Sequence, residues 1–307
     1  RDDLEKKADT IAMEQQDVGG VPVCYVADET NGITYVNAYF DLHGLTREEI
    51  SYVYLLSDLI GDMDTTDHTY GGIASLIDLY TGGIDYSVSA FSNRTDNKDY
   101  MPVFRFKAKG LTQNLDKLVD LLKEISLHTV FTNKDRLVEL VEETKAGWDM
   151  DAFRRGHTIV MHRVLSYVSP VEAFCDAGEL SYYEFITDVA SRIHTDAEAI
   201  GAKLAAVMKK IFTRSALTLE VTASRDDWQT VKNTVSSWIT ALPQGEKLQG
   251  LCDFGLSRKN EGIMTSGTVQ YVAKGGNFRS HGYDYDGSLM VLDTILQYGY
   301  LWTKIRV

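Results

Sequence analysis

The sequence is poor in the features that mark secreted and membrane proteins. Its three cysteines, Cys24, Cys175 and Cys252, are far apart and form no Cys-x-x-Cys pair. A disulfide framework and a thiolate zinc site are therefore not expected, and a reducing intracellular compartment is favoured, either bacterial cytoplasm or an organelle matrix. No apolar run reaches the length of about 18 residues that a membrane span needs. The charged stretch RDDLEKKADT at 1–10 lacks the apolar core of a signal peptide.

An excess of positive charge is also missing. The 307 residues include 31 Lys and Arg against 44 Asp and Glu, which gives a formal net charge of −13. A nucleic-acid-binding protein needs a basic face, and an anionic membrane surface would repel this chain. We therefore expect neither nucleic acid nor a membrane as a partner. The acidic balance fits solubility or the attraction of basic peptides.

The motifs of a self-contained active site are absent as well. The sequence holds no phosphate-binding loop, no dinucleotide fingerprint and no G-x-S-x-G nucleophile elbow. Zinc peptidase motifs need two histidines four residues apart, and no pair of the seven histidines has that spacing. His157 and His162 are five apart, which places them about 140° apart around a helix. From the residues alone, we expect no catalytic residue and no metal ligand in this chain.

Two acidic stretches raise the question of a metal site. GDMDTTDH brings Asp62, Asp64, Asp67 and His68 together, and carboxylates at this density can bind Ca²⁺ or Mg²⁺. The spacing does not match the EF-hand loop, so a solvated loop at a helix end is the favoured interpretation and metal binding the alternative. HGYDYDG at 281–287 is interpreted in the same way, as a loop that caps the next helix.

Hydrophobic periodicity predicts the first elements. GITYVNAYFDL at 32–42 is rich in aromatic and β-branched residues, which predicts a strand buried on both faces. TREE at 46–49 is a capping box, and the helix that it opens should run to about residue 60. Leu55 and Leu59 belong to one apolar stripe of this helix and should lie in the core.

The rest of the chain follows the same reasoning. Alternation predicts strands over 84–90 and 103–109 that pair as an antiparallel hairpin with one solvated face. The other predicted elements are a helix over 70–80, helices after Asn114 and Asn133 and on to about residue 210, a strand over 216–222, a further helix, a linker at 242–250, a strand over 268–274, and a final helix from about Gly287.

Strands and helices come in blocks and do not alternate strictly. This order predicts an α+β fold with a mainly antiparallel sheet covered by helices. The linker divides the chain into a first unit, 1–250, and a second, 251–307. The second unit has about one strand and one helix, which is too little to close a core. We therefore expect it to be an incomplete second domain.

Four separated stretches resemble one protein family. They are TNGITYVNAYFDLHGLTREEISYVYLLSDLIGDMDTTDHTY, LYTGGIDYSVSAF, SGTVQYVAKGGNF and YGYLWTKIRV, and they run in order from about residue 20 to the end. Together they resemble the C-terminal half of a pitrilysin-type (insulinase-like) metallopeptidase, in the branch of presequence protease and falcilysin. The resemblance implies four similar α+β domains in two halves that close like a clamshell. This chain would be the third domain, 1–250, and the beginning of the fourth, 251–307.

The resemblance also implies where zinc is held. The family's inverted motif His-x-x-Glu-His lies in the N-terminal half. When LLSDL is set against that motif, Leu55 and Leu59 take the histidine positions and Asp58 takes the glutamate position. Leucine cannot ligate zinc. Zinc is therefore expected in the intact enzyme, bound by the missing N-terminal half, and this chain should be inactive alone.

One substrate-binding residue follows from the resemblance. In the family, an Arg and a Tyr near the end of this region reach towards the substrate, and Arg306 matches that Arg. A guanidinium suits a peptide carbonyl or the oxyanion that forms on it. From the residues alone, a helix-end arginine favoured by the helix dipole is the preferred interpretation of Arg306, and the resemblance shifts the preference to substrate binding.

The implied function is the non-catalytic half of a zinc metalloendopeptidase that encloses and degrades unfolded peptides. Its partners would be the N-terminal catalytic half of the same protein and the peptide substrates. The alternative is a zinc-less binding or scaffold subunit that pairs with an active chain. An unrelated enzyme would need a cluster such as Asp62, Asp64 and His68 to bind a metal.

Overall fold

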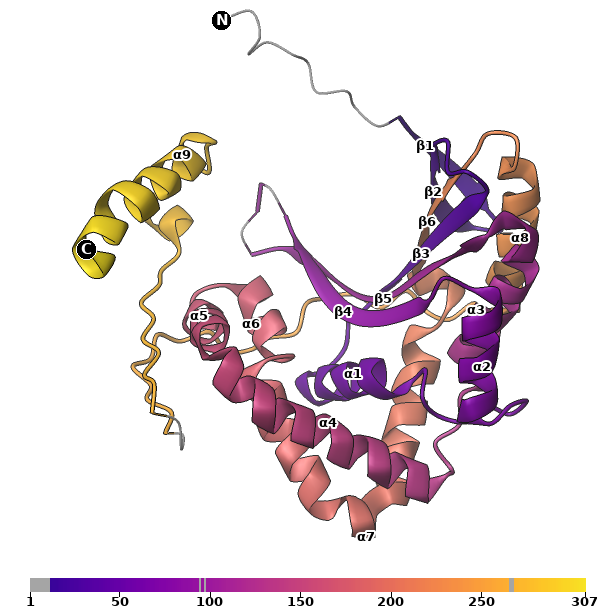
Figure 1. The fold of residues 1–307 in the computed structure, drawn as a ribbon, viewed down its shortest axis with the longest axis horizontal. Coiled ribbons are helices and arrows are strands. Elements are labelled where there is room, and N and C mark those ends of the chain that lie inside the picture. Colours follow the sequence, from indigo (N-terminus) through magenta and orange to yellow (C-terminus); the bar gives the residue numbers. More distant parts are fainter. Residues whose placement is uncertain (1–11, 94, 97, 265–267) are drawn as a thin grey trace, which may run out of the picture.

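A six-stranded sheet forms the centre of the molecule (Figure 1). The computed structural model describes residues 12–93, 95, 96, 98–264 and 268–307, without the side chains of Ala152, Phe153 and Arg306. The strand order is β1-β2-β6-β3-β5-β4, and every neighbouring pair is antiparallel except β2 and β6. The strands are β1 (Met13–Val18), β2 (Val21–Ala27), β3 (Ile33–Asp41), β4 (Ile84–Ser92), β5 (Tyr100–Leu111) and β6 (Leu217–Ala223). The predicted α+β class with a mainly antiparallel sheet is confirmed.

Helices α1 to α8 gather on one side of this sheet. They are α1 (Arg47–Leu59), α2 (Tyr70–Tyr80), α3 (Leu115–His128), α4 (Lys134–Arg154), α5 (Gly156–Ser166), α6 (Pro170–Asp176), α7 (Leu180–Ile211) and α8 (Trp228–Ala241). Helix α9 (Ser288–Thr294), which continues as a π-helix over Ile295–Arg306, lies apart from them (Figure 1). No helix in the described part of the chain is long and apolar enough to cross a membrane.

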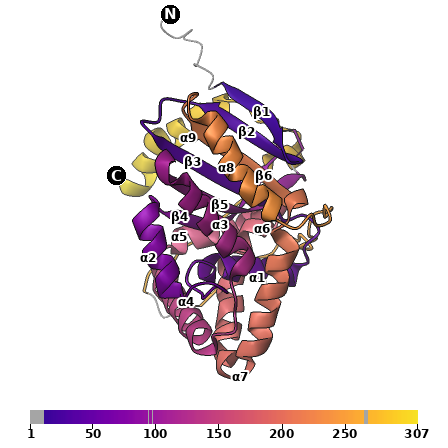
Figure 2. The same ribbon diagram turned by 90° about the vertical axis from the view of Figure 1, so that its right-hand side faces the viewer.

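Two layers of helices can be followed in Figures 1 and 2. Helices α3 and α8 pack against each other on the sheet, and α1 packs below β4. The long helix α7 then packs on α1 and on α4, which forms an outer layer. Among the described residues, the opposite face of the sheet carries no helix layer, so the sheet has one buried face and one open face.

An aromatic cluster holds the buried face to the helices. Phe40 and Phe106, on neighbouring strands, meet Phe212 and Trp238 edge to face, with ring centroids 4.9–6.1 Å apart. The indole of Trp238 also donates a buried hydrogen bond of 3.0 Å to Ser126 Oγ. Truncation of one such ring to alanine usually lowers the unfolding free energy by about 3–5 kcal/mol. This cluster therefore fixes which face of the sheet is turned towards the helices.

Most elements lie where the periodicity predicts them. Helix α1 begins with the predicted capping box, in which Thr46 Oγ1 accepts from Glu49 N and Glu49 Oε2 accepts from Thr46 N. The β4–β5 hairpin is present, and Phe104, Phe106 and Ala108 are buried. The prediction that 32–42 is buried on both faces is wrong. Only alternate residues of β3 are buried, because the helices cover one face of the sheet.

The β1–β2 hairpin is missing from the sequence prediction. Gly19 and Gly20, both at positive φ (63° and 81°), form its two-residue turn, and Asp17 Oδ1 accepts from Gly20 N. A Gly-Gly pair before a valine-rich segment, here VPVCYVA, is a recognised hairpin signal. The hairpin was therefore within reach of sequence analysis.

The strand predicted over 268–274 is wrong. This segment is irregular, and Val269 and Val272 are 63% and 91% exposed. A strand needs a neighbour for its backbone hydrogen bonds, and no described strand lies beside this one. The final helix is present as predicted, but its large apolar side chains, such as Trp302 at 56%, are exposed.

The described residues 251–264 and 268–277 form an irregular segment, called the strap below. Its start packs on the first unit, where Leu251, Cys252 and Phe254 contact the core and Gly44 N donates to Gly250 O. Further on, Arg163 on α5 binds Glu261 with two hydrogen bonds of 2.7 and 3.0 Å. The same guanidinium donates to the buried Asp176 at 2.8 Å. One arginine thus ties the strap to α5 and α6.

We expect Glu261→Gln to loosen the strap. Arg163 and then Tyr167 hold the pKa of Glu261 at about 2, so the ion pair is intact at neutral pH and is lost only as the pH falls from about 4.5 towards 2. Amide protection over residues 254–264 should fall about five- to tenfold at neutral pH, by hydrogen exchange. Glu246→Gln, at an exposed linker position, is the matched control. Unchanged protection in Glu261→Gln would show that packing alone holds the strap.

Candidate functional site

Helix α1 carries the residues that resemble a zinc motif. Leu55 and Leu59 are fully buried and belong to the core, as the apolar stripe predicts. Their side chains offer no lone pair to a metal. The positions where the family's zinc ligands would lie are thus used for packing, and these residues do not fit a zinc ion. Among the described residues, no group of three His, Cys, Asp or Glu side chains is arranged to hold a metal.

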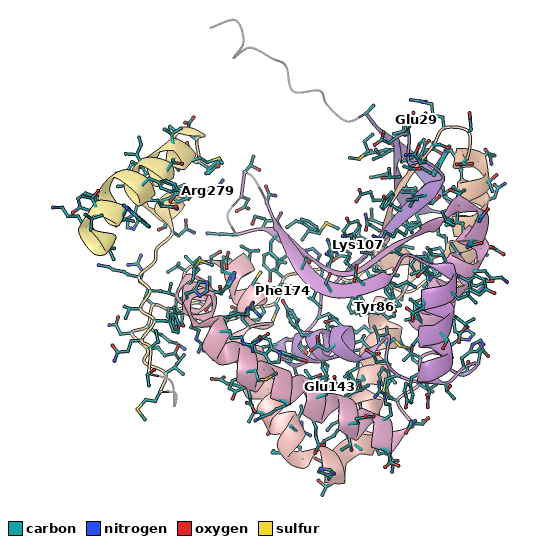
Figure 3. All side chains as sticks on the ribbon, in the orientation of Figure 1. Glu29, Tyr86, Lys107, Glu143, Phe174 and Arg279 are labelled. Carbon is teal, nitrogen blue, oxygen red and sulfur yellow. The ribbon has the colours of Figure 1, made fainter. Side chains whose placement is uncertain are left out.

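A cavity of about 460 Å³ opens between α1 and α4. Asp58 and Asp62 line it from the α1 side, and Glu143 and Asp151 line it from α4, with Trp148 between them. Figure 3 shows Glu143 on α4, facing the helix layer below the sheet. Four carboxylates and one arginine, Arg136, make this cavity acidic. Arg136 is itself engaged, since it donates to Asp62 O and to Glu139 Oε2.

Asp58 is the carboxyl group of this cavity whose pKa is clearly raised. It lines the wall and accepts a hydrogen bond of 2.5 Å from the hydroxyl of Tyr182 on α7. The packed helices around it limit hydration of the charged form, which raises the pKa of Asp58 from 3.8 to about 6, against the lowering effect of the Tyr182 hydrogen bond. The Asp58 carboxyl therefore titrates near pH 6, close to the pH of many cellular compartments.

The open face of the sheet is the other candidate surface. Figure 3 shows Lys107 on this face, away from α1, and Tyr86 on the opposite, helix-covered face. In register across the sheet, Tyr39 of β3 lies beside Arg105 of β5. The hydroxyl of Tyr39 donates to Glu220 Oε2 at 2.8 Å, and burial together with this bond raises the pKa of Tyr39 to about 12. Tyr39 is thus a fixed, neutral donor at neutral pH.

The acidic stretch of the α1–α2 loop does not converge on one point. Asp64 accepts from Tyr70 N and from Asn133 Nδ2, both at 2.8 Å, and so joins the starts of α2 and α4. Asp67 pairs with His128 at 3.1 Å, and His68 pairs with Glu124 at 2.9 Å. These bonds are those of a structural loop, the interpretation that the sequence favours.

The other predicted site residues lie apart from this loop. His157 and His162 are both on α5, where His162 pairs with Glu172 at 3.0 Å and His157 lies near the ring of Tyr271. Asp286 Oδ1 accepts from Ser288 N at 2.8 Å, so the 281–287 loop caps the last helix as predicted. The backbone of Arg306 is in that helix, and its side chain lies outside the described part of the structure.

Together these features define a class of protein: a one-sided α+β domain with helix α1 in its core and, among the described residues, no metal-holding cluster, as expected of a non-catalytic peptidase-associated domain. Comparison with protein families agrees, since the family of domains associated with subfamily C of the M16 peptidases matches residues 1–189. The chain therefore belongs to this peptidase-associated family.

Two relatives match nearly the whole length of the chain. The chain is 31% identical to Protein HypA of Clostridium perfringens over 307 residues, and 28% identical to presequence protease 1 (chloroplastic/mitochondrial) of Arabidopsis thaliana over 310 residues. These matches cover 100% and 99% of the chain but only 31% and 28% of the relatives. The chain thus spans about a third of the length of these relatives.

Solved structures show the same fold. A peptidase M16 inactive domain from Pseudomonas fluorescens matches with a TM-score of 0.55 and 15% identity, over 78% of this chain and 53% of that one. A protease from Helicobacter pylori matches with a TM-score of 0.52 and 13% identity, over 76% and 51%. The chain is thus similar to non-catalytic M16 peptidase domains in fold.

The raised pKa of Asp58 predicts a pH-dependent stability. The folded state binds this proton more tightly than the unfolded state, so Asp58 lowers stability as the pH rises from about 4 to 6 and keeps it low above that range. Asp58→Asn should therefore raise the melting temperature at about pH 7 and match the wild type at about pH 4. Thermal melts across this range measure the effect, with the exposed Asp78→Asn as control. A gain of equal size at both pH values would contradict it.

The burial of Leu59 predicts that a histidine at this position will not create a metal site. Leu59→His places a polar ring in the core, so we expect the unfolding free energy to fall by about 2–4 kcal/mol, without bound zinc. Leu59→Met keeps the apolar volume and should lose less than about 1.5 kcal/mol. Denaturant melts and elemental analysis of the purified variants check both statements. Stoichiometric zinc in Leu59→His would refute the assignment of this position to the core.

Proposed function

We propose that this chain is the non-catalytic C-terminal part of a zinc metalloendopeptidase that encloses and degrades unfolded peptides. The observation that carries the proposal is the full burial of Leu55 and Leu59 on helix α1, the two residues that the resemblance sets against the family's zinc-binding histidines. The names of the presequence protease relatives support peptide cleavage as the activity of the whole protein. The zinc and the catalytic glutamate would belong to the N-terminal half, which is the partner that we propose.

The open face of the sheet would form part of the chamber wall. It presents hydroxyl, amide and cationic groups in ordered rows, which suits contact with peptide backbone and side chains. A face of this kind needs no fixed cover, because its polar side chains are stable in water. In this proposal, unfolded peptides pass over the open face while their scissile bond lies at the catalytic half.

Residues 251–307 would begin a second domain of the same type. Its last helix exposes a series of large apolar side chains: Met290, Val291, Leu292, Ile295, Leu296, Tyr298, Tyr300, Leu301, Trp302 and Ile305. A helix that is apolar on most sides is normally buried in a core. We propose that further parts of the parent protein cover it, and that Arg306 then reaches the substrate. The three free cysteines fit a reducing compartment, bacterial cytoplasm or an organelle matrix.

Reconstitution tests the proposal. The 307-residue chain, the N-terminal half and their equimolar mixture are assayed on a quenched unfolded peptide, with and without a chelator. We expect chelator-sensitive cleavage only in the mixture, and slower turnover when the mixture contains Arg306→Gln. Cleavage by the pure 307-residue chain would refute the proposal. Equal cleavage by the N-terminal half alone would favour a scaffold role instead.

A further inference from the structure

Three cations follow one another on the open face of β5. Arg105, Lys107 and Lys109 alternate with the buried Phe104, Phe106 and Ala108, so all three point away from the helices. Alternate residues of a strand are about 6.8 Å apart, which sets the spacing of this basic row. Figure 3 shows its middle member, Lys107, above the centre of the sheet.

Arg105 is the member of the row with a buried donor that has no hydrogen-bond partner. Its Nε is buried and has no hydrogen-bond partner, and no carboxylate in the described part of the chain lies within ion-pair distance of it. Arg136, Arg163 and Arg192 each contact a carboxylate. A guanidinium presents its donors as a planar fork that matches a carboxylate. Arg105 therefore lies half-buried in the sheet, and the donors open to a ligand are those of its terminal nitrogens, because Nε itself is buried.

The neighbouring strands neutralise the basic row only in part. In register, Tyr39 and Ser87 flank Arg105, while Asn37 and Asp85 flank Lys107. Asp85 is exposed, and among the described residues it forms no ion pair. Glu220 lies one strand further away and accepts the hydroxyl of Tyr39. The open face as a whole carries Asp41, Asp85 and Glu220 beside the three cations, and within the row Arg105 has no carboxylate directly opposite it on either neighbouring strand.

We propose that this row is a subsite for an extended peptide segment with acidic side chains at alternate positions. The inference rests on the proposed function, because it assigns part of a peptide substrate to the open face. An extended peptide repeats every two residues, as β5 does, so carboxylates at positions i and i+2 can meet Arg105 and Lys107 together. The negative charge of the whole chain repels long polyanions such as nucleic acid. A short acidic stretch in an otherwise neutral peptide can bind the basic row without the repulsion that the net negative charge of the chain exerts on a long polyanion.

The fluorescence anisotropy of labelled, C-terminally amidated peptides tests the subsite on the 307-residue chain. One peptide carries three aspartates at alternate positions, a second carries them consecutively, and a third carries asparagines. We expect the alternating peptide to bind most tightly, and its affinity to fall with added salt. Arg105→Gln should weaken that binding about tenfold, while Arg105→Lys, which keeps the charge and loses the fork, should weaken it less.

Arg154→Gln, at an exposed position at the end of α4, is the matched control and should bind as the wild type does. Thermal melts confirm that each variant is folded. Equal binding by wild type and Arg105→Gln would overturn the subsite. Equal affinity for the alternating and consecutive peptides would overturn the proposed alternate spacing of the carboxylates. Equal affinity for the aspartate and asparagine peptides would overturn the assignment to acidic side chains.

The outcome is separable from that of the proposed function. Peptide binding that depends on Arg105, without cleavage in the reconstituted mixture, would retain the subsite and remove the peptidase assignment. Cleavage in the mixture, with peptide affinity unchanged in Arg105→Gln, would retain the peptidase and remove the subsite.

Discussion

The packing of one face of the sheet against α1, α3 and α8 determines what the other face can present. Phe40 and Phe106 enter the aromatic cluster with Trp238, and this fixes the register of β3 and β5. A shift of one residue would turn every side chain of a strand to the other face. Arg105 and Tyr39 are therefore held on the open face by the burial of their neighbours, and the chemistry of that face depends on the core beneath it.

Helix α1 has a structural role in this chain. Leu55 and Leu59 lie in the core, where polar side chains would need hydrogen-bond partners or a metal. Asp58 lies on a cavity wall and accepts a hydrogen bond from Tyr182. The helix is therefore held by apolar contacts along its buried face and by one polar contact at the cavity.

Local signals in the sequence were sufficient for much of the fold. The capping box and leucine stripe define α1, and alternation defines β5 together with its wet face. The segment 268–274 has the same alternation and is irregular, because the neighbouring strand that would pair with it is not among the described residues. The cavity could not be predicted, since Asp58 and Glu143 come from helices far apart in the chain. The lack of a partner for Arg105 depends on side chains from three strands, which periodicity alone does not reveal.

The strap has a consequence for how the chain can be divided. Sequence composition places the boundary at residue 250, yet Leu251, Cys252 and Phe254 cover the first unit, and Glu261 is held by Arg163. A fragment ending at residue 250 would expose the apolar surface that Leu251, Cys252 and Phe254 cover. It would also leave Arg163 paired with Asp176 but without Glu261. The packing of the first unit thus extends past residue 250, where the linker composition places its end. The strap covers part of the surface of this unit.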